Sequence, residues 1–179
     1  MSKPLPRKFY NRPTLEVAKD LLGCILLRKI NGKEIRAVIT DVEAYIGEDD
    51  LACHASKGRT LRTEIMYGKP GFVYVYLIYG MYNILNIITE SKNFPAAVMI
   101  RAVKIENVDY KKTNGPGKVC MRLGIDKKLH STDVTLGQHL WIEKPKERGQ
   151  FEFISSPRVG IAYAKHCSEY PWRFSIKQV

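Results

Sequence analysis

The chain has 179 residues, and 29 Lys and Arg against 18 Asp and Glu give a formal net charge of +11. This length favours one domain over residues 1–179, large enough to bury a core without a disulfide or structural metal. The positive excess favours a polyanionic partner, most commonly nucleic acid, although it also suits solubility or an anionic membrane surface. The longest apolar run, residues 70–88, is interrupted by polar residues and shorter than the roughly 20 residues of a membrane-spanning helix.

The four cysteines argue against both a metal centre and a disulfide framework. They lie far apart in the sequence, and neither a Cys-x-x-Cys motif nor zinc-finger spacing occurs. We therefore expect free thiols in a reducing compartment and no metal. The first ten residues are polar and contain prolines, without the apolar stretch of a signal peptide, so we expect a cytoplasmic protein.

The N-terminal quarter predicts a helix followed by a β-hairpin. Residues 13–22 carry Leu and Ala at helical spacing, and Gly23 provides a stop. A short strand is expected over residues 24–30, and Asn31-Gly32 is typical of a two-residue hairpin turn. A long second strand follows over residues 34–46.

Glu43 is the first unusual residue of this second strand. Alternation places it on the same face as Asp41 and Tyr45, between apolar neighbours. Such a residue is more often solvated on an exposed face; the alternative is a pocket, where loss of hydration would suit it to general-base chemistry. Arg101 lies within another predicted strand, residues 96–105, where a charge needs a partner, and Glu43 is a candidate.

The sequence between these two strands predicts less regular structure and then a hairpin. An acidic turn at residues 47–50 is expected to cap a short helix over residues 51–56 that carries His54, and a single His is more often structural than catalytic. Residues 57–69 are basic and polar, which predicts a surface connection. Residues 70–88 hold four of the ten tyrosines and predict two strands. In the first strand, alternation places Tyr74 and Tyr76 on one face and Val73, Val75 and Leu77 on the other.

Gly80 marks the turn of that hairpin, because glycine tolerates positive φ. This puts Tyr79 and Met81 at the tip, where a large apolar side chain has nothing obvious to pack against. Any single tyrosine here is more often core than functional. Asn83 and Asn86 interrupt the apolar return strand; buried amides need partners, so each is either a structural hydrogen bonder or a reader of a ligand.

The C-terminal third predicts one helix and late strands. Residues 114–117 form a Gly-Pro-Gly loop before a helix from Lys118, whose amides and ammonium are suited to a phosphate, although this is also ordinary loop chemistry. Strands are expected over residues 141–143 and 171–176, with a turn and a short extended piece at 155–160. These patterns predict a basic α+β or mixed α/β domain.

Several segments together carry a more specific signal. They are Glu43-Ala-Tyr45-Ile-Gly47, His54, Met66-Tyr-Gly-Lys-Pro-Gly71, Tyr74-Val-Tyr76-Leu-Ile-Tyr79-Gly80-Met81-Tyr82, Asn86-Ile87, Ile100-Arg101-Ala102, Gly115-Pro-Gly-Lys118-Val-Cys120 and Arg158-Val159-Gly160. In this order, and over nearly the whole chain, they resemble the alkyladenine (3-methyladenine) DNA glycosylase family.

The resemblance implies an α+β fold: a single compact domain with a curved, largely antiparallel sheet, flanking helices and a protruding β-hairpin that inserts into DNA. Tyr79 matches the residue that wedges into the duplex in place of the extruded nucleotide, which offsets part of the cost of unstacking. Met81, Tyr82 and Lys118 are expected to contact DNA as well. The expected partner is duplex DNA containing damaged purines, bound by a monomer that is not attached to a membrane.

The resemblance also implies a base pocket. Tyr45, His54 and Tyr76 match residues that sandwich and hydrogen-bond the flipped base, and Asn86 matches the side chain that crowds the 2-amino group of guanine. Tyrosine faces suit cationic alkylated purines, because a ring face attracts positive charge.

For the chemistry, the resemblance assigns Glu43 as the general base. It would activate a water for attack on C1′ of the sugar, with Arg101 and the main-chain carbonyl of Val159 helping to hold that water. A purine alkylated at N3 or N7 is already charged and leaves unaided, whereas hypoxanthine needs protonation. No lysine matches a catalytic position, so we expect simple hydrolysis without a cofactor and without strand cleavage, leaving an abasic site.

Departures from the family pattern at Thr63, Tyr67 and Ile84 bear on substrate range, which includes 3-methyladenine, hypoxanthine and ethenoadenine as candidates.

Two other hypotheses remain. A binding-only protein that shields damaged DNA would need Tyr79 and the stacking tyrosines but not Glu43. An RNA-binding module would stack bases on the tyrosines, although no RNA-recognition motif occurs.

Overall fold

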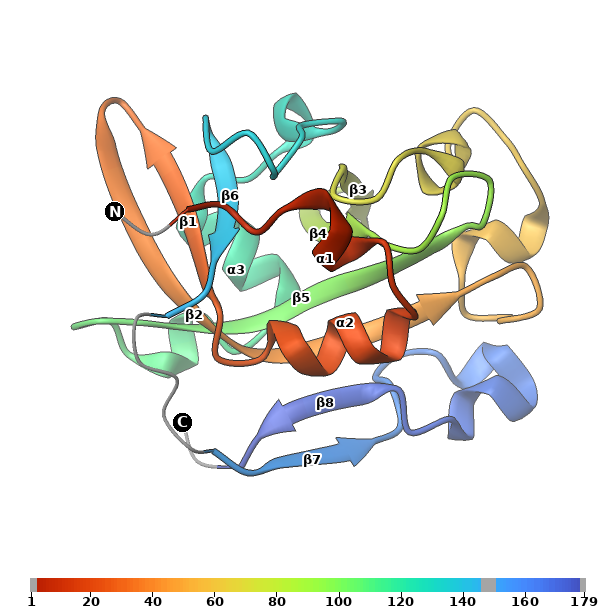
Figure 1. Cartoon of the computed structure of the whole chain (residues 1–179). Helices are drawn as coiled ribbons and strands as arrows, with labels where there is room; N and C mark the ends of the chain where they lie inside the picture. The colour runs from red at the N-terminus through yellow and green to blue at the C-terminus, as the bar shows by residue number, and fades with distance from the viewer. Residues whose placement is uncertain (1–2, 146–150, 178–179) are drawn as a thin grey trace.

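The computed structural model describes residues 3–145 and 151–177. A curved sheet forms the body, with short helices against it (Figure 1). All strand pairings recorded among the described residues are antiparallel. The predicted α+β class and the curved antiparallel sheet are therefore confirmed. Within the described residues, no helix combines the length and the apolar character that crossing a membrane requires.

The strands follow the order β3-β4-β5-β2-β1-β6, and β8 pairs with both β2 and β7. Their bounds are β1 (Ile25–Ile30), β2 (Lys33–Ile46), β3 (Val73–Ile78), β4 (Tyr82–Ile88), β5 (Ala96–Ile105), β6 (Leu140–Glu143), β7 (Phe153–Ser156) and β8 (Arg173–Ile176). The α-helices are α1 (Arg7–Tyr10), α2 (Thr14–Leu21) and α3 (Pro116–Leu123). The 3-10 helices are η1 (His54–Lys57), η2 (Glu64–Tyr67), η3 (Tyr110–Lys112), η4 (Lys127–Leu129) and η5 (Ala162–Glu169).

Strand β2 is the centre of the sheet. One of its edges pairs with β5; the other pairs first with β1 and then, around Asp41 to Glu43, with β8. The register shifts on both sides of Asp41, as at a β-bulge, and a bulge bends a strand and re-aims its side chains. Glu43 therefore lies in the middle of the sheet, with a strand on either side.

The two faces of the sheet carry different cores, because side chains alternate along a strand. Val73 and Val75 of β3 join an aliphatic cluster under α2 and α3, whereas Tyr74 and, partly buried, Tyr76 join a second cluster under η1, η2 and η5. The expected division of β3 into a valine face and a tyrosine face is confirmed. The candidate site lies on the tyrosine side.

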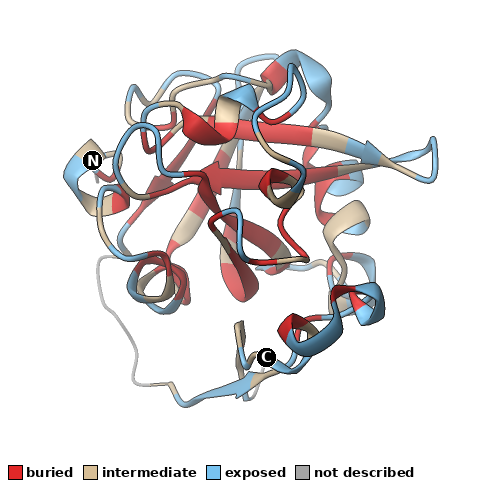
Figure 2. Cartoon of the chain, turned by 90° about the vertical axis from the view of Figure 1, so that its right-hand side faces the viewer, coloured by how far each residue is buried: buried red, intermediate tan, exposed pale blue. Residues whose placement is uncertain are grey.

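The predicted hairpin is present and its turn includes Tyr79 as well as Gly80. Both residues have positive φ, 50° and 68°, and the Met81 N–H donates to the Ile78 carbonyl, which describes a type I′ turn. Figure 2 shows the strand pair changing from buried to exposed toward its tip, where Tyr79 is 88% exposed. A bulky residue in the left-handed region is strained, and such strain concentrates at functional sites.

Several local predictions for residues 13–105 are confirmed. The helix over residues 13–22 is α2, the Asn31-Gly32 turn joins β1 to β2, and the strand over residues 96–105 is β5. Gly23 has φ of 78°, a conformation that ends a helix without a steric penalty.

Three local predictions are wrong in part. The helix expected over residues 51–56 is η1, which starts only at His54, because Asp50 accepts the Ala52 N–H in a turn that precedes η1. The expected surface connection contains η2, whose Met66 and Tyr67 are buried as anchors of the second cluster. The expected turn at residues 155–160 begins as the end of β7, and η5 after it was not predicted.

Candidate active site

The Glu43 carboxylate is completely buried and is held by two hydrogen-bond donors and one ion pair. The Tyr45 hydroxyl donates to Oε2 at 2.7 Å, and the Val159 backbone N–H donates to Oε1 at 3.0 Å. The Arg101 guanidinium lies 3.4 Å from the same Oε1. These contacts fix the position of the carboxylate within the sheet. The commoner expectation of a solvated Glu43 is therefore wrong, and the predicted pairing with Arg101 is confirmed.

Arg101 is shared between two carboxylates. Its Nε lies 3.6 Å from Asp41, and Asp41 in turn accepts hydrogen bonds from Nε and Nη2 of Arg173 at 3.1 and 2.7 Å. The four side chains form an alternating row of charges from Glu43 to Arg173 across β5, β2 and β8. Because each charge has an opposite neighbour, the row holds Arg101 against Glu43 in a largely buried environment.

A second buried ion pair, Asp50 with Arg158, positions the neighbours of Glu43. Both side chains are fully buried, and the guanidinium donates to the two carboxylate oxygens at 2.6 and 2.8 Å. It also donates to the carbonyls of Ala44 and Cys167, and it packs against the rings of Tyr45 and Trp172, 4.8 and 5.1 Å from their centroids.

Arg158 therefore supports both oxygens of Glu43 indirectly. It precedes Val159, the donor to Oε1, and its guanidinium packs on Tyr45, the donor to Oε2. Sequence reasoning missed this role of Arg158, and it missed Asp50, because these residues are 108 positions apart. The available signals were the Arg158-Val159-Gly160 motif and the acidic turn, which could not be joined without the fold.

A small cavity lies beside Tyr45, whose hydroxyl donates to Glu43. It has a volume of about 20 Å³ and is lined by Tyr45, Ala52, His54, Met66, Tyr74, Tyr76, Asn86 and Ala97. The four residues predicted for a base pocket, Tyr45, His54, Tyr76 and Asn86, are all among them. The volume admits about one water-sized sphere, so a base ring enters only if the lining side chains move apart.

The ionisation states of the lining groups favour neutral side chains. Burial and the nearby Glu43 charge raise the pKa of Tyr45, and burial with neighbouring Tyr74 raises the pKa of Tyr76. Burial lowers the pKa of His54 to about 4, and the charge of Arg62 acts in the same direction. At neutral pH the cavity thus presents phenols and an uncharged imidazole.

The hydrogen-bond partners of His54 define its tautomer. Nε2 lies 3.4 Å from Nη2 of Arg62, and a guanidinium can only donate, so Nε2 is the acceptor. The proton then resides on Nδ1, which lies 2.8 Å from the Tyr74 hydroxyl and donates to it. The ring of His54 also packs edge-on against Tyr76, with centroids 4.5 Å apart.

Asn86 is buried on β4, and its amide nitrogen donates to the Tyr74 carbonyl at 3.3 Å. The predicted need of this amide for a partner is therefore met within the hairpin, while its side chain still lines the cavity. The positions Thr63, Tyr67 and Ile84 are buried but are absent from the cavity lining, so they support the pocket from behind.

The remaining predicted residues lie outside the cavity. Tyr79 and Met81 are at the exposed hairpin tip, and Tyr82 begins β4. Helix α3 passes so close to Tyr82 that a β-carbon at Gly117 would lie 3.0 Å from its ring, which brings Lys118 near the hairpin. In the described part of the chain, no group of three or more His, Cys, Asp and Glu side chains is arranged to hold a metal ion.

Comparison with known proteins identifies the family of this chain. Residues 8–179 match the family model described as Methylpurine-DNA glycosylase (MPG). The chain is 45% identical to a protein of Methanocella arvoryzae over 97% of this chain and 92% of the relative. It is 46% identical to one from Wolbachia sp. subsp. Brugia malayi over 96% of each chain. Both relatives are named "Putative 3-methyladenine DNA glycosylase".

We expect Arg158→Met to lower the free energy of unfolding by about 3–5 kcal/mol, because it leaves the Asp50 carboxylate buried without a partner. The double variant Asp50→Asn/Arg158→Met should recover part of this loss. Chemical denaturation measures both. The matched control is Arg7→Met, since Arg7 also joins an aspartate, Asp133, and an aromatic ring, but its side chain is 37% exposed. Equal losses at Arg7 and Arg158 would contradict the prediction.

A second prediction concerns protonation of His54. Nitrogen NMR of the ring should show a neutral imidazole with its proton on Nδ1 down to a pH near its pKa of about 4. Because this pKa lies below the usual 6.5, the unfolded chain takes up the proton first, and His54 reduces stability as the pH falls from about 6.5 to 4. His54→Gln should remove that part of the acid sensitivity. An imidazolium in the folded protein at pH 6 would overturn this assignment.

Proposed function

The chain belongs to the methylpurine-DNA glycosylase family and is a DNA-3-methyladenine glycosylase, and on this premise we propose how it acts. The enzyme flips an alkylated or deaminated purine out of duplex DNA and hydrolyses the N-glycosidic bond with a water activated by Glu43. The product is an abasic site for base excision repair. Because the family is one of enzymes, the binding-only and RNA-binding hypotheses are set aside.

The observation that carries the proposal is the fully buried Glu43 carboxylate with its two hydrogen-bond donors and its ion pair with Arg101. As the bond from C1′ to the base nitrogen breaks, the base takes the electron pair and the sugar becomes oxocarbenium-like. A fixed negative charge nearby stabilises that cation. The water oxygen then bonds to C1′, and Glu43 accepts the proton that the water releases.

Arg101 and Val159 have complementary roles in this scheme. Arg101 orients Glu43 before the reaction, because its guanidinium lies 3.4 Å from Oε1. The Val159 N–H already donates to Glu43, so the carbonyl of the same residue is the group we assign to the attacking water. Arg101 would then act on Glu43, the general base, and the Val159 carbonyl on the attacking water.

The cavity residues recognise the flipped base. Tyr45 and Tyr76 supply ring faces that favour cationic alkylated purines, and Asn86 excludes the 2-amino group of guanine. His54, whose pKa is about 4, is uncharged at neutral pH and has a hydrogen-bond acceptor at Nε2, so we do not assign it as the acid for a neutral base. Hypoxanthine and ethenoadenine should therefore leave more slowly than 3-methyladenine, which departs already charged.

Tyr79 enters the duplex in place of the flipped nucleotide, and Met81, Tyr82 and Lys118 contact DNA beside it. The support is the position of Tyr79 in a strained turn at the exposed tip of the hairpin. We further propose that the enzyme is a monomer of the cytoplasm, acting at the nucleoid if its source is prokaryotic. The departures at Thr63, Tyr67 and Ile84 would then act on substrate range by moving the cavity lining.

We expect Glu43→Gln to slow base release from methylated duplex DNA by about 10²–10⁴-fold, because the amide keeps the shape of the carboxylate but cannot accept the proton. Single-turnover release of base measures this, with DNA binding measured in parallel. Glu64→Gln is the matched control, since Glu64 forms an exposed ion pair with Arg59. Unchanged release by Glu43→Gln would refute the mechanism, and failure of the wild type on methylated, hypoxanthine and ethenoadenine DNA would refute the activity.

Tyr79→Asn is expected to slow base release without lowering the stability of the fold. Asparagine tolerates positive φ better than tyrosine, so this variant should unfold at the same or slightly higher denaturant concentration. Base release from a fully paired duplex should nevertheless slow, because no side chain replaces the extruded base. Release from a lesion placed in an unpaired bubble should recover most of the rate, since less unstacking is needed there. Equal slowing on both substrates would contradict the wedge role.

A further inference from the structure

A basic groove lies beside the β4 side of the hairpin. It has a volume of about 470 Å³ and is lined by Lys111, Lys112, Lys118, Met121 and Arg122, from η3 and α3. The Lys118 ammonium donates to the Lys111 carbonyl and to Oδ1 of Asn114, both at 2.9 Å. These acceptors are neutral, so they fix the ammonium in place without cancelling its charge. The contact between Gly117 and Tyr82 keeps this groove next to the base of the hairpin tip.

A second groove runs along β3, the strand at the end of the sheet. It has a volume of about 410 Å³ and is lined by Leu61, Arg62, Tyr74, Val75, Tyr76, Leu77, Lys127 and His130. The ring of His130 is tied to the strand through Nδ1, 3.2 Å from the Val75 carbonyl. The Arg62 guanidinium lies 5.6 Å from the centroid of the Tyr76 ring.

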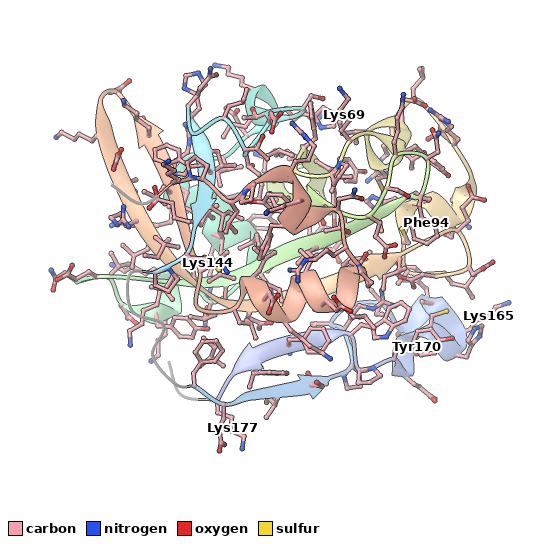
Figure 3. The ribbon with its side chains drawn as sticks, viewed as in Figure 1. Lys69, Phe94, Lys144, Lys165, Tyr170 and Lys177 are labelled. Carbon is pink, nitrogen blue, oxygen red and sulfur yellow. The ribbon has the colours of Figure 1, made fainter. Side chains whose placement is uncertain are left out.

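The two grooves are alike in composition and differ in position. One groove is lined by four Lys and Arg side chains and the other by two, neither has a carboxylate among its lining residues, and each contains one strongly exposed apolar side chain, Met121 (68%) or Leu61 (102%). They share no lining residue; β3 lines one groove, and the other lies near the start of β4 through the contact of Gly117 with Tyr82. Positive charge by itself would not single them out, because lysines such as Lys69, Lys144, Lys165 and Lys177 point outward from several sides of the molecule (Figure 3).

We propose that these grooves hold the backbones of the two DNA strands, one strand in each, when the hairpin is inserted. The inference rests on the proposed function and adds the path of the DNA to it. The minor groove is only about 6 Å wide and is bounded by the two sugar-phosphate backbones, so a hairpin inside it has one backbone on either flank. Lys and Arg then contact phosphates, and Met121 and Leu61 contact deoxyribose.

The first test is the salt dependence of binding. The probe is a 25-base-pair duplex with one central abasic-site analogue, so that neither base release nor Glu43 is required. Each of Lys112→Gln and Lys127→Gln should reduce the slope of log Kd against log salt by about 0.9 for each phosphate that the lysine no longer neutralises. The matched control is Lys8→Gln on α1, which lies near the start of β3 because Arg7 donates to the Pro70 carbonyl. Lys8 is exposed, and its variant should leave the slope unchanged.

The second test assigns each groove to a strand. Methylphosphonate linkages replace the phosphates around the analogue in one strand at a time, which removes their charge. The binding loss of Lys112→Gln should vanish when one strand is neutralised, and that of Lys127→Gln should vanish only when the other strand is neutralised. Coupling of both lysines to the same strand, or slopes that match Lys8→Gln, would overturn the proposal. These outcomes are independent of base release, which tests the proposed function separately.

Discussion

The buried ion pair between Asp50 and Arg158 is the contact on which the arrangement of the site depends. It joins the loop after β2 to the segment that follows β7, and both side chains are fully buried. A buried pair is weak evidence for stability, because desolvation offsets much of its attraction. Its effect here is geometrical: the guanidinium, fixed by four hydrogen bonds, places the Val159 N–H and the Tyr45 ring on the two sides of Glu43. Loss of the pair would release both donors at once.

The site combines a charged half and a neutral half. Glu43, Arg101, Asp41 and Arg173 alternate in sign across three strands, so the fully buried Glu43 carboxylate has an oppositely charged neighbour. The cavity beside it is lined by groups whose pKa values are shifted by burial toward the uncharged form. The boundary is Tyr45, which donates to Glu43 and also lines the cavity. If positive charge develops on a sugar placed between Glu43 and the cavity, the negative charge of Glu43 faces it from one side. The neutral side chains of the cavity face it from the other side.

Local patterns predicted the elements whose structure depends on local chemistry. The Asn31-Gly32 turn, α2 and the alternation along β3 follow from turn residues and periodicity, and all are present. The prediction failed where tertiary contacts decide: Met66 and Tyr67 are buried in a stretch that is otherwise polar. Glu43 could be singled out as unusual, but its burial depends on groups from β5 and from the segment after β7, which are distant in the chain. The Asp50–Arg158 pair could not be predicted from the sequence for the same reason, since a separation of 108 residues carries no periodic signal.

The hairpin and the two basic grooves would contribute to DNA recognition through different physical interactions. Phosphate contacts supply affinity that falls steeply with salt and is indifferent to sequence, so they suit an enzyme that must scan undamaged DNA. Tyr79, in its strained turn, would insert only where a base pair opens, because insertion requires unstacking of the bases. If the two DNA backbones are held in the two grooves, the hairpin tip stays centred in the minor groove while Tyr79 inserts. A damaged pair would then be distinguished by how readily it opens, before its base reaches the cavity.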